Sequence, residues 1–279
     1  MTIQLGLIGE NISKSRAPRL HPLLGRLCGL DVTYTPFDSE GVPGFDPMAT
    51  LQARMDEGFK GLNVTHPYKT VVAAALPNLR PRVRRLGSIN TVVFVDGQWI
   101  GANTDHSGTI RGYRHVFGTL PAGRVLMMGA GGVSRAIAFA LQDLGVVEIL
   151  IHDLDDARAH TLTQVLSDHG CAARTVAAED LRAAAAQADG LVNATPMGMY
   201  KHPGMPLPAD AIGGQRWAFD AVYTPLWTDF LRCCQDRGLA VMTGFELFLF
   251  QGLDAFRCFT GITVDEDEVR DEVASWMAD

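Results

Sequence analysis

One stretch of the chain, residues 124–155, restricts the possible folds most strongly. An apolar run at 124–128 leads into Gly129-Ala130-Gly131-Gly132, then a helical stretch follows, and a second apolar run at 148–151 ends beside acidic residues. A strand, a glycine turn, a helix and a second strand form the opening unit of a dinucleotide-binding fold. More than 100 residues precede this unit. We therefore expect two domains, with the dinucleotide-binding domain second.

The glycine turn is expected to bind the cofactor pyrophosphate through backbone N–H groups at a helix N-terminus. The residues assigned to this role are Gly129, Ala130, Gly131, Gly132 and Val133. Ser134 occupies the third glycine position of the usual pattern, and the small Ala136 and Ala140 still allow the helix to lie close to the sheet.

Acidic residues after the second strand favour NAD over NADP. Asp153 lies 24 residues after Gly129, where a carboxylate accepts hydrogen bonds from ribose hydroxyls. Asp155 and Asp156 add negative charge that would repel a 2′-phosphate. Arg158 is expected to face solvent as the only nearby cation.

Composition points to a small soluble ligand as the partner. The 279 residues carry a formal net charge of -7 and no long Lys/Arg run, which argues against nucleic acid or a membrane surface. We find no signal peptide and no apolar run long enough to span a bilayer, so we expect a cytoplasmic protein. Five cysteines without Cys-x-x-Cys spacing and scattered histidines predict no metal site. Monomer and homodimer both remain possible.

The first part of the chain predicts an α/β domain with a mainly parallel sheet. Strands are expected at 5–8, 32–37 and 61–65, with helices between them, and a hairpin at 91–95 and 99–101 turns at Asp96-Gly97. Ligands of such sheets lie beyond the carboxyl ends of the strands. Ser15, Asn63, Thr65 and Lys69 fall in such positions.

The second part predicts a Rossmann-type domain. Helices are expected at 107–117, 156–169, 181–187 and 226–237, strands at 172–176, 191–194, 217–220 and 239–242, and closing helices at 245–259 and 265–277. The long loop at 195–215 is interpreted as a cofactor cover. We expect a substrate domain at 1–105, completed by 245–279, and a cofactor domain at 106–244.

Lys69 and Asp105 are the catalytic candidates. Lys69 follows a strand end in a Thr-His-Pro-Tyr turn, and Asp105 ends an Asn-Thr-Asp loop before the domain connection. If both point into one cleft, the pair can take the proton from an alcohol as hydride leaves its carbon. Gln251, polar on an otherwise apolar helix, needs a partner or a ligand.

Several separated motifs together resemble the shikimate/quinate dehydrogenase family over nearly the full length. The motifs lie at 9–21, 63–69, 88–91, 101–105, 129–132, 193–199, 220–225 and 244–251. This resemblance implies that Lys69 and Asp105 are the catalytic pair. It implies a substrate site for a hydroxylated ring acid, formed by Ser15, Asn63, Thr65, Asn90 and Gln251, with Tyr223 near the acid's carboxylate. It also implies that Thr195, Met197, Val222 and Gly244 line the cofactor side.

Three departures from the usual family pattern bear on selectivity. Ala17 stands where members specific for shikimate and NADP usually carry a second serine, and loss of that donor weakens binding by roughly 1.5–3 kcal/mol if its bond is charged. His152-Asp153-Leu154 replaces an Asn-Arg-Thr type segment and is similar to the NAD-using quinate/shikimate branch. Phe245 replaces a methionine near the nicotinamide.

The sequence thus predicts a two-domain NAD-dependent oxidoreductase that oxidises a ring secondary alcohol of quinate, shikimate or a related cyclic hydroxy acid. Three alternatives stay open at this point. They are a cofactor-binding regulator without turnover, an NADP-dependent shikimate dehydrogenase, and a methyltransferase that uses the glycine turn for adenosyl-methionine.

Overall fold

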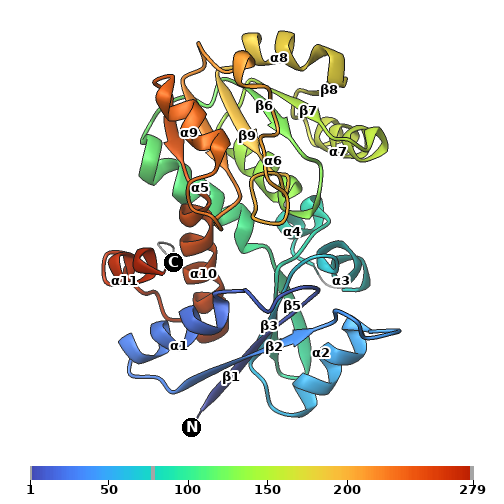
Figure 1. Cartoon of the computed structure of the whole chain (residues 1–279). Helices are drawn as coiled ribbons and strands as arrows, with labels where there is room; N and C mark the ends of the chain where they lie inside the picture. Colours follow the sequence, from blue (N-terminus) through green and yellow to red (C-terminus); the bar gives the residue numbers. More distant parts are fainter. Residues whose placement is uncertain (1, 77–78, 277–279) are drawn as a thin grey trace. The chain divides into compact units, whose positions relative to one another are not determined.

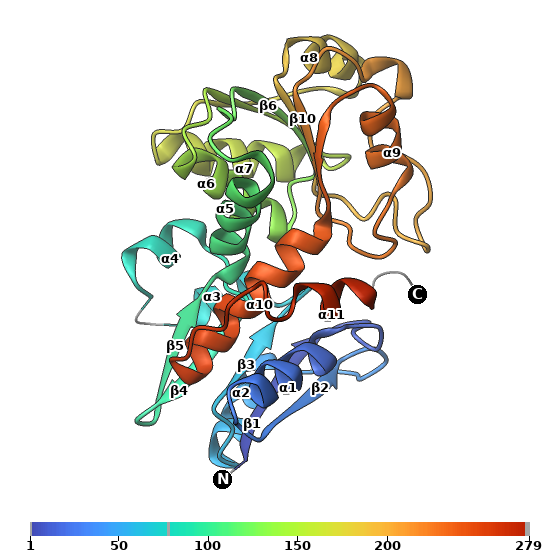
Figure 2. The ribbon, with the colours of Figure 1, turned by 90° about the vertical axis from the view of Figure 1, so that its left-hand side faces the viewer.

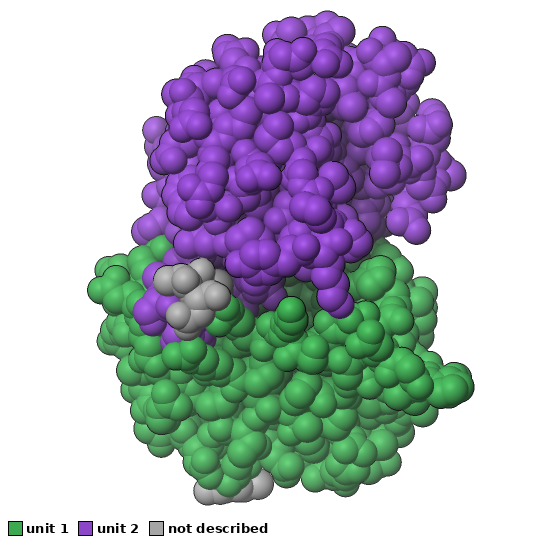
Figure 3. All heavy atoms as spheres, in the orientation of Figure 1, with its two compact units in different colours: residues 1–107, 249–273 green, residues 108–248, 274–279 purple. Residues whose placement is uncertain are grey.

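The computed structural model describes residues 2–76 and 79–276. The chain forms two compact units, each with its own sheet (Figures 1 and 3). Unit 1 comprises Met1–Ser107 and Leu249–Val273, and unit 2 comprises Gly108–Phe248 and Ala274–Asp279. Unit 1 is therefore built from two segments that lie far apart in the sequence.

Unit 1 contains a five-stranded mixed sheet with the strand order β2-β1-β3-β4-β5. Its strands are β1 (Ile3–Gly9), β2 (Val32–Asp38), β3 (Gly61–Val64), β4 (Thr91–Val95) and β5 (Gln98–Ala102). β1 pairs in parallel with β2 and β3, whereas β4 is antiparallel to β3 and β5. Asp96 and Gly97 have φ values of 51° and 71°, as a two-residue type I′ hairpin requires. The predicted hairpin is confirmed, and the parallel part of the sheet is limited to three strands.

The helices of unit 1 cover both faces of this sheet. They are α1 (Ala17–Leu27), α2 (Pro47–Asp56), α3 (Lys69–Ala75), α4 (Pro81–Leu86), the first turn of α5 (Thr104–Phe117), most of α10 (Gly244–Thr260) and α11 (Arg270–Ser275). Leu51 of α2 packs with Ile8 and Leu62 in one core cluster. On the other face α10 lies against α1, because a Cβ at Gly252 would come within 2.3 Å of the Leu20 side chain (Figure 2).

Alternation along β3 decides which side chains face the α1–α10 side. Leu62 and Val64 join the core beneath α2 and α3. Gly61 points the opposite way, where a Cβ would meet the Phe259 ring of α10 at 2.7 Å. Because side chains alternate along a strand, Asn63 shares the face of Gly61. β3 therefore places a buried amide on the side that also carries α1 and α10.

Unit 2 contains a six-stranded parallel sheet with the order β11-β10-β9-β6-β7-β8. Its strands are β6 (Arg124–Met128), β7 (Glu148–His152), β8 (Ala173–Thr175), β9 (Gly190–Asn193), β10 (Trp217–Asp220) and β11 (Ala240–Met242). Its further helices are α6 (Gly132–Asp143), α7 (Asp156–Asp168), α8 (Leu181–Gln187) and α9 (Asp229–Asp236), with short 3₁₀ turns at Ala178–Asp180 and Ala209–Ala211. The strand order reverses between β6 and β9, so the ligand crevice of this fold lies at their carboxyl ends.

Several helices differ from the predicted ones. α5 begins at Thr104, three residues early, because the Asn103 side chain accepts a hydrogen bond from the His106 N–H. α9 begins three residues late, because Thr228 caps it by accepting from the Leu231 N–H. α11 is shorter than predicted, and residue 277 lies outside the described residues. α3 begins at Lys69 and was not predicted.

Within the described ranges, none of the helices combines the length and the apolar character needed to cross a membrane.

Candidate active site

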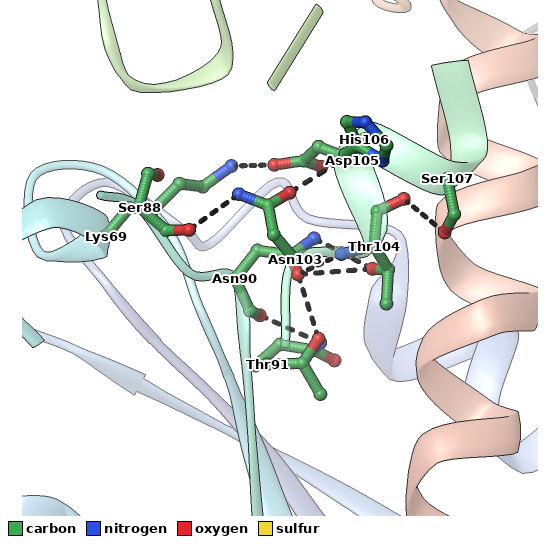
Figure 4. A network of polar contacts seen from close by, with 10 residues as sticks. Lys69, Ser88, Asn90, Thr91, Asn103, Thr104, Asp105, His106 and Ser107 are labelled. Atoms are coloured by element: carbon green, nitrogen blue, oxygen red, sulfur yellow. Dashed lines mark hydrogen bonds and ion pairs between the residues drawn. The ribbon is translucent and has the colours of Figure 1, made fainter. Parts of the chain in front are cut away.

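Lys69 and Asp105 form an ion pair within unit 1 (Figure 4). Lys69 Nζ lies 2.6 Å from Asp105 Oδ2, and the two side chains are 14% and 8% exposed. Lys69 is the first residue of α3, and Asp105 lies in the first turn of α5. Two helix starts therefore bring the amine and the carboxylate together in a largely buried position, and the catalytic role of the pair stays a prediction.

Asn90 holds the backbone just before Asp105. Its Oδ1 accepts hydrogen bonds from the Thr104 N–H at 2.8 Å and from Thr91 Oγ1 at 3.0 Å, and its Nδ2 donates to Thr104 Oγ1 at 2.9 Å. The Asn103 amide also donates to the Ser88 carbonyl at 2.9 Å (Figure 4). The first turn of α5 is thus tied to the chain at the start of β4.

Asn63 is the centre of a second buried polar group. Its Oδ1 accepts from the Tyr34 hydroxyl at 2.8 Å, and its Nδ2 donates to the Asn90 carbonyl and to Thr91 Oγ1. The His21 ring stacks on Tyr34 with centroids 4.6 Å apart. Burial lowers the pKa of His21 to about 3, although a hydrogen bond with Asn63 acts in the opposite direction. His21 is therefore neutral at pH 7.

Ser15 lies in the loop before α1, and Ala17 is the first residue of that helix. Ser15 Oγ accepts a hydrogen bond from the Ala17 N–H at 3.3 Å, which leaves the hydroxyl proton able to donate elsewhere. Asp38, at the end of β2, accepts from the Asn11 and Ile12 N–H groups, both at 3.0 Å. These and further backbone hydrogen bonds lower the pKa of Asp38, with the bond from the Glu40 N–H acting most strongly.

Thr65 and Gln251 complete the predicted set in unit 1. The Thr65 N–H donates to the Ile8 carbonyl at 2.9 Å, and the Thr65 carbonyl accepts from the Tyr68 N–H at 2.9 Å. Gln251 lies on α10 and is partly buried. Thr65 therefore fixes the turn that leads to Lys69.

The glycine turn of unit 2 combines a close backbone approach at Gly129 with open space at the start of α6. Gly129 has a φ of 102°, and a Cβ there would come within 2.7 Å of the Ala194 carbonyl oxygen. A Cβ at Gly131 would meet no atom within 4 Å, so the space beside that residue is open. α6 begins at Gly132 without a side-chain cap, which leaves N–H groups at its N-terminus for an anion.

Asp153 contacts the glycine turn directly. Its Oδ2 accepts from the Ala130 N–H at 2.7 Å, and its Oδ1 accepts from the Asp155 N–H at 2.9 Å. Asp155 caps α7 by accepting from the Ala157 N–H and forms an ion pair with Arg158 at 3.2 Å. The Asp155 carboxylate is thus engaged by the N-terminus of α7 and by Arg158.

Arg158 is not the only cation near the turn, contrary to the prediction. Arg135 of α6 lines the same hollow of about 210 Å³ as Arg158, together with Ala130. Arg135 lies one helical turn after the glycine residues, so it shares the end of α6 that faces this hollow. Burial lowers the pKa of its guanidinium below the ordinary value.

Asn193 and Asp220 join the loops that follow β9 and β10. Asn193 Oδ1 accepts from Thr195 Oγ1 at 2.7 Å, and its Nδ2 donates to the Met197 carbonyl and to Asp220 Oδ1, both at 2.9 Å. Asp220 also accepts from the Val222 N–H. The loop segments with Thr195, Met197 and Val222 are therefore tied to one another at the carboxyl end of the sheet.

Two further predicted residues lie beside this group. A Cβ at Gly244 would come within 2.4 Å of the Val222 carbonyl oxygen, so only glycine allows this approach. The Tyr223 ring stacks on Phe248 with centroids 5.2 Å apart.

Burial raises the pKa of Asp220 to about 6, although hydrogen bonds from Thr228, Val222 and Asn193 act against it.

The predicted site residues divide between the two units. Unit 1 contains Ser15, Ala17, Asn63, Thr65, Lys69, Asn90, Asp105 and Gln251; unit 2 contains Tyr223 and the residues assigned to the cofactor. Sequence reasoning missed Tyr34, Thr104 and Arg135. The position of Arg135 directly after the glycine turn was an available signal, whereas Tyr34 meets Asn63 only through strand pairing. Among the described residues, no group of three or more His, Cys, Asp or Glu side chains could hold a metal ion.

Comparison with known proteins places both units in one family. Residues 7–92 match the family model described as shikimate dehydrogenase substrate binding domain. The chain is 38% identical over 272 residues to a shikimate dehydrogenase (NADP(+)) of Arthrobacter sp. (strain FB24), covering 95% of this chain and 92% of that protein. It is 38% identical over 279 residues to a quinate/shikimate dehydrogenase (NAD(+)) of Corynebacterium efficiens, covering 96% of each.

Solved structures agree with these relatives. A quinate dehydrogenase from Corynebacterium glutamicum in complex with NAD superposes with a TM-score of 0.92 at 37% identity, covering 98% of this chain and 99% of that one. A shikimate 5-dehydrogenase from Thermus thermophilus in complex with NADP(H) and shikimate gives a TM-score of 0.84 at 32% identity, covering 98% of this chain and 99% of that one. The chain belongs to the shikimate/quinate dehydrogenase family.

Proposed function

We propose that this protein is a quinate/shikimate dehydrogenase that prefers NAD and oxidises a ring secondary alcohol of a cyclic hydroxy acid. The buried Lys69–Asp105 ion pair carries the proposal, because it supplies a proton-transfer group in the unit whose family model is a substrate binding domain. The relatives named above act on quinate or shikimate according to their names, which gives the substrate class.

Proton transfer is assigned to Lys69. A nicotinamide cofactor, when bound, supplies the hydride acceptor for the substrate carbon. In oxidation Lys69 Nζ, as the neutral amine, takes the proton from the substrate hydroxyl, and in reduction the ammonium returns it. Asp105 Oδ2 lies 2.6 Å from Nζ and holds the nitrogen in place. The low exposure of both side chains keeps bulk water away from the transferred proton.

The substrate side is assigned to Ser15, Asn63, Thr65, Asn90 and Gln251, with Tyr223 near the acid's carboxylate. Ser15 is the best donor to a carboxylate, since its oxygen accepts from Ala17 and its proton is left to donate. Ala17 offers no hydroxyl beside it. We therefore propose quinate, or an analogue with different ring substituents, as a better substrate than shikimate.

The NAD preference rests on Asp153. Its carboxylate lies at the end of β7 against the glycine turn, where ribose hydroxyls of a bound dinucleotide are expected. Asp155 pairs with Arg158 and so reduces the attraction of that cation for a 2′-phosphate. Arg135 favours anionic groups at the same hollow, and we assign it to the pyrophosphate side because it follows the glycine turn on α6.

Replacement of Lys69 by alanine tests the chemistry. Lys69→Ala should lower kcat on the best substrate by about 100-fold or more, with a much smaller change in KM, because general acid–base catalysis contributes that much. Lys60→Ala is the matched control, since Lys60 is an exposed lysine outside the site. Steady-state rates on quinate and shikimate give kcat and KM for the native protein and both variants. Turnover that survives Lys69→Ala would refute the assigned pair.

Cofactor preference needs a separate experiment. The ratio of kcat/KM for NAD to that for NADP should exceed about 10 in the native protein and fall in Asp153→Asn, because the charge and one ribose acceptor are lost. Asp168→Asn removes an equal charge from the exposed last turn of α7, at the end of the helix away from the glycine turn, and should leave the ratio nearly unchanged. A native protein that prefers NADP would disprove the NAD assignment but leave the proton-transfer assignment intact.

A further inference from the structure

A hydrogen bond between α5 and α10 lies next to two of the proposed site residues. Ser107 Oγ donates to Asp254 Oδ2, although the two residues are 147 positions apart in the sequence. Ser107 follows Asp105 by two residues in the first turns of α5. Asp254 follows Gln251 by three residues on α10, so the two side chains share one face of that helix.

Burial makes this bond stronger than a surface contact. Asp254 is only 3% exposed, and the Arg257 guanidinium lies 3.7 Å from its Oδ1 at the surface side. Ser107 Oγ is also 3.3 Å from the Thr104 carbonyl oxygen, so its single proton has two possible acceptors (Figure 4). A hydroxyl donates more strongly to a carboxylate than to a neutral carbonyl, which favours Asp254 as the acceptor.

The first turn of α5 is held from two directions. On the strand side, the Asn90 amide binds the Thr104 N–H and hydroxyl. On the helix side, Asp254 binds the Ser107 hydroxyl. Asp105 lies between these two anchors, and its carboxylate meets Lys69 at 2.6 Å. A shift at either anchor would move the carboxylate relative to the amine.

We propose that Ser107 and Asp254 are positioning residues for the reaction, which hold Asp105 against Lys69 and fix the separation of Asp105 and Gln251. The inference rests on the proposed function for the identity of the site residues. Neither residue needs to touch the substrate. Their role is to connect the helix that carries the catalytic carboxylate with the helix that carries a substrate amide.

Kinetics of four variants and one control variant test this role. Ser107→Ala and Asp254→Asn should each lower kcat about tenfold and raise KM for the cyclic acid severalfold, while KM for NAD stays within about twofold. Ser107→Thr keeps the hydroxyl, so its kcat and its KM for the cyclic acid should stay close to those of the native protein. The double variant should be no worse than the more impaired single variant, because Ser107→Ala removes the bond and Asp254→Asn weakens the same bond by making its acceptor neutral. Thr260→Ala removes a hydroxyl that binds the Phe256 carbonyl on the same helix and is the matched control.

Chemical labelling of Lys69 provides a readout that does not need turnover. An amine-acylating reagent, followed by peptide mass spectrometry, gives the Lys69 rate relative to the exposed Lys60. The relative acylation rate of Lys69 should rise severalfold in Ser107→Ala and Asp254→Asn, because a displaced Asp105 carboxylate no longer covers the Lys69 amine. In Ser107→Thr the rate should equal that of the native protein.

The outcomes separate the two proposals. A lower melting temperature with unchanged kcat, KM and Lys69 labelling would show a purely structural bond and overturn the inference. A native protein that oxidises no cyclic hydroxy acid, combined with raised Lys69 labelling in the variants, would refute the proposed function and support the positioning role. Equal labelling in all variants would refute the positioning role whether or not the native protein is active.

Discussion

His21 should make the stability of unit 1 depend on pH. Its ring is 1% exposed, stacks on Tyr34 and lies near the rings of Phe256 and Phe259. Burial lowers its pKa from 6.5 to about 3 in the folded protein. The unfolded chain therefore binds a proton below pH 6.5, whereas the folded protein does not until about pH 3. The free energy of unfolding should fall across this window by roughly 1 kcal/mol per pH unit, or about 2 kcal/mol by pH 4.5.

Replacement by phenylalanine isolates this contribution. His21→Phe keeps an aromatic ring beside Tyr34 but cannot titrate, so urea unfolding at several pH values should give a flatter profile than the native protein between pH 6.5 and 4.5. The comparison uses the slope, so an overall loss of stability in the variant does not matter. His160→Gln, a change at an exposed histidine of α7, is the control. Parallel profiles for the native protein and His21→Phe would refute the reasoning.

Two changes in unit 2 have equally specific outcomes. Gly131→Ala places a methyl group where no atom lies within 4 Å, so unfolding free energy should change little while KM for the dinucleotide rises about tenfold or more, as calorimetry and kinetics together would show. Asp220→Asn should remove a pH dependence of the opposite sign to that of His21. Because the pKa of Asp220 rises to about 6 on folding, its contribution to unfolding free energy is most unfavourable above pH 6 and diminishes as pH falls toward 3.8. An unchanged profile in Asp220→Asn would contradict this account.

Local patterns were sufficient to predict most elements of the fold. The order of apolar runs and glycine turns predicted a dinucleotide-binding sheet, since a βαβ unit can wind in few ways, and the strand order of that sheet reverses between β6 and β9. The Asp96-Gly97 turn predicted the hairpin because both residues tolerate positive φ. Helix starts were harder, since they depend on caps such as Asn103 and Thr228, whose partners are backbone groups that sequence periodicity does not reveal.

In the candidate site, too, some features could be predicted from local sequence patterns and others could not. Lys69 and Asp105 could be predicted from their positions at strand and loop ends, and the structure joins them. The hydrogen bonds that hold this part of the chain in place could not be predicted from the sequence. They join Asn90 to Thr104, Tyr34 to Asn63, and Ser107 to Asp254, and they form only when strands and helices distant in sequence pack together.

Arg135 was missed for a different reason. Its place after the glycine turn was visible, but its effect depends on sharing a hollow with Arg158, which only the packing of α6 and α7 reveals. Selectivity in this chain is therefore expected to depend on such long-range neighbours as much as on the motif residues. Arg135 and Arg158 line one hollow with Ala130, whose N–H donates to Asp153, so we propose that the charges of these arginines act together with Asp153 in cofactor choice. A cofactor comparison that varies Arg135 together with Asp153 would measure that balance directly, because independent effects of the two charges would add and coupled effects would not.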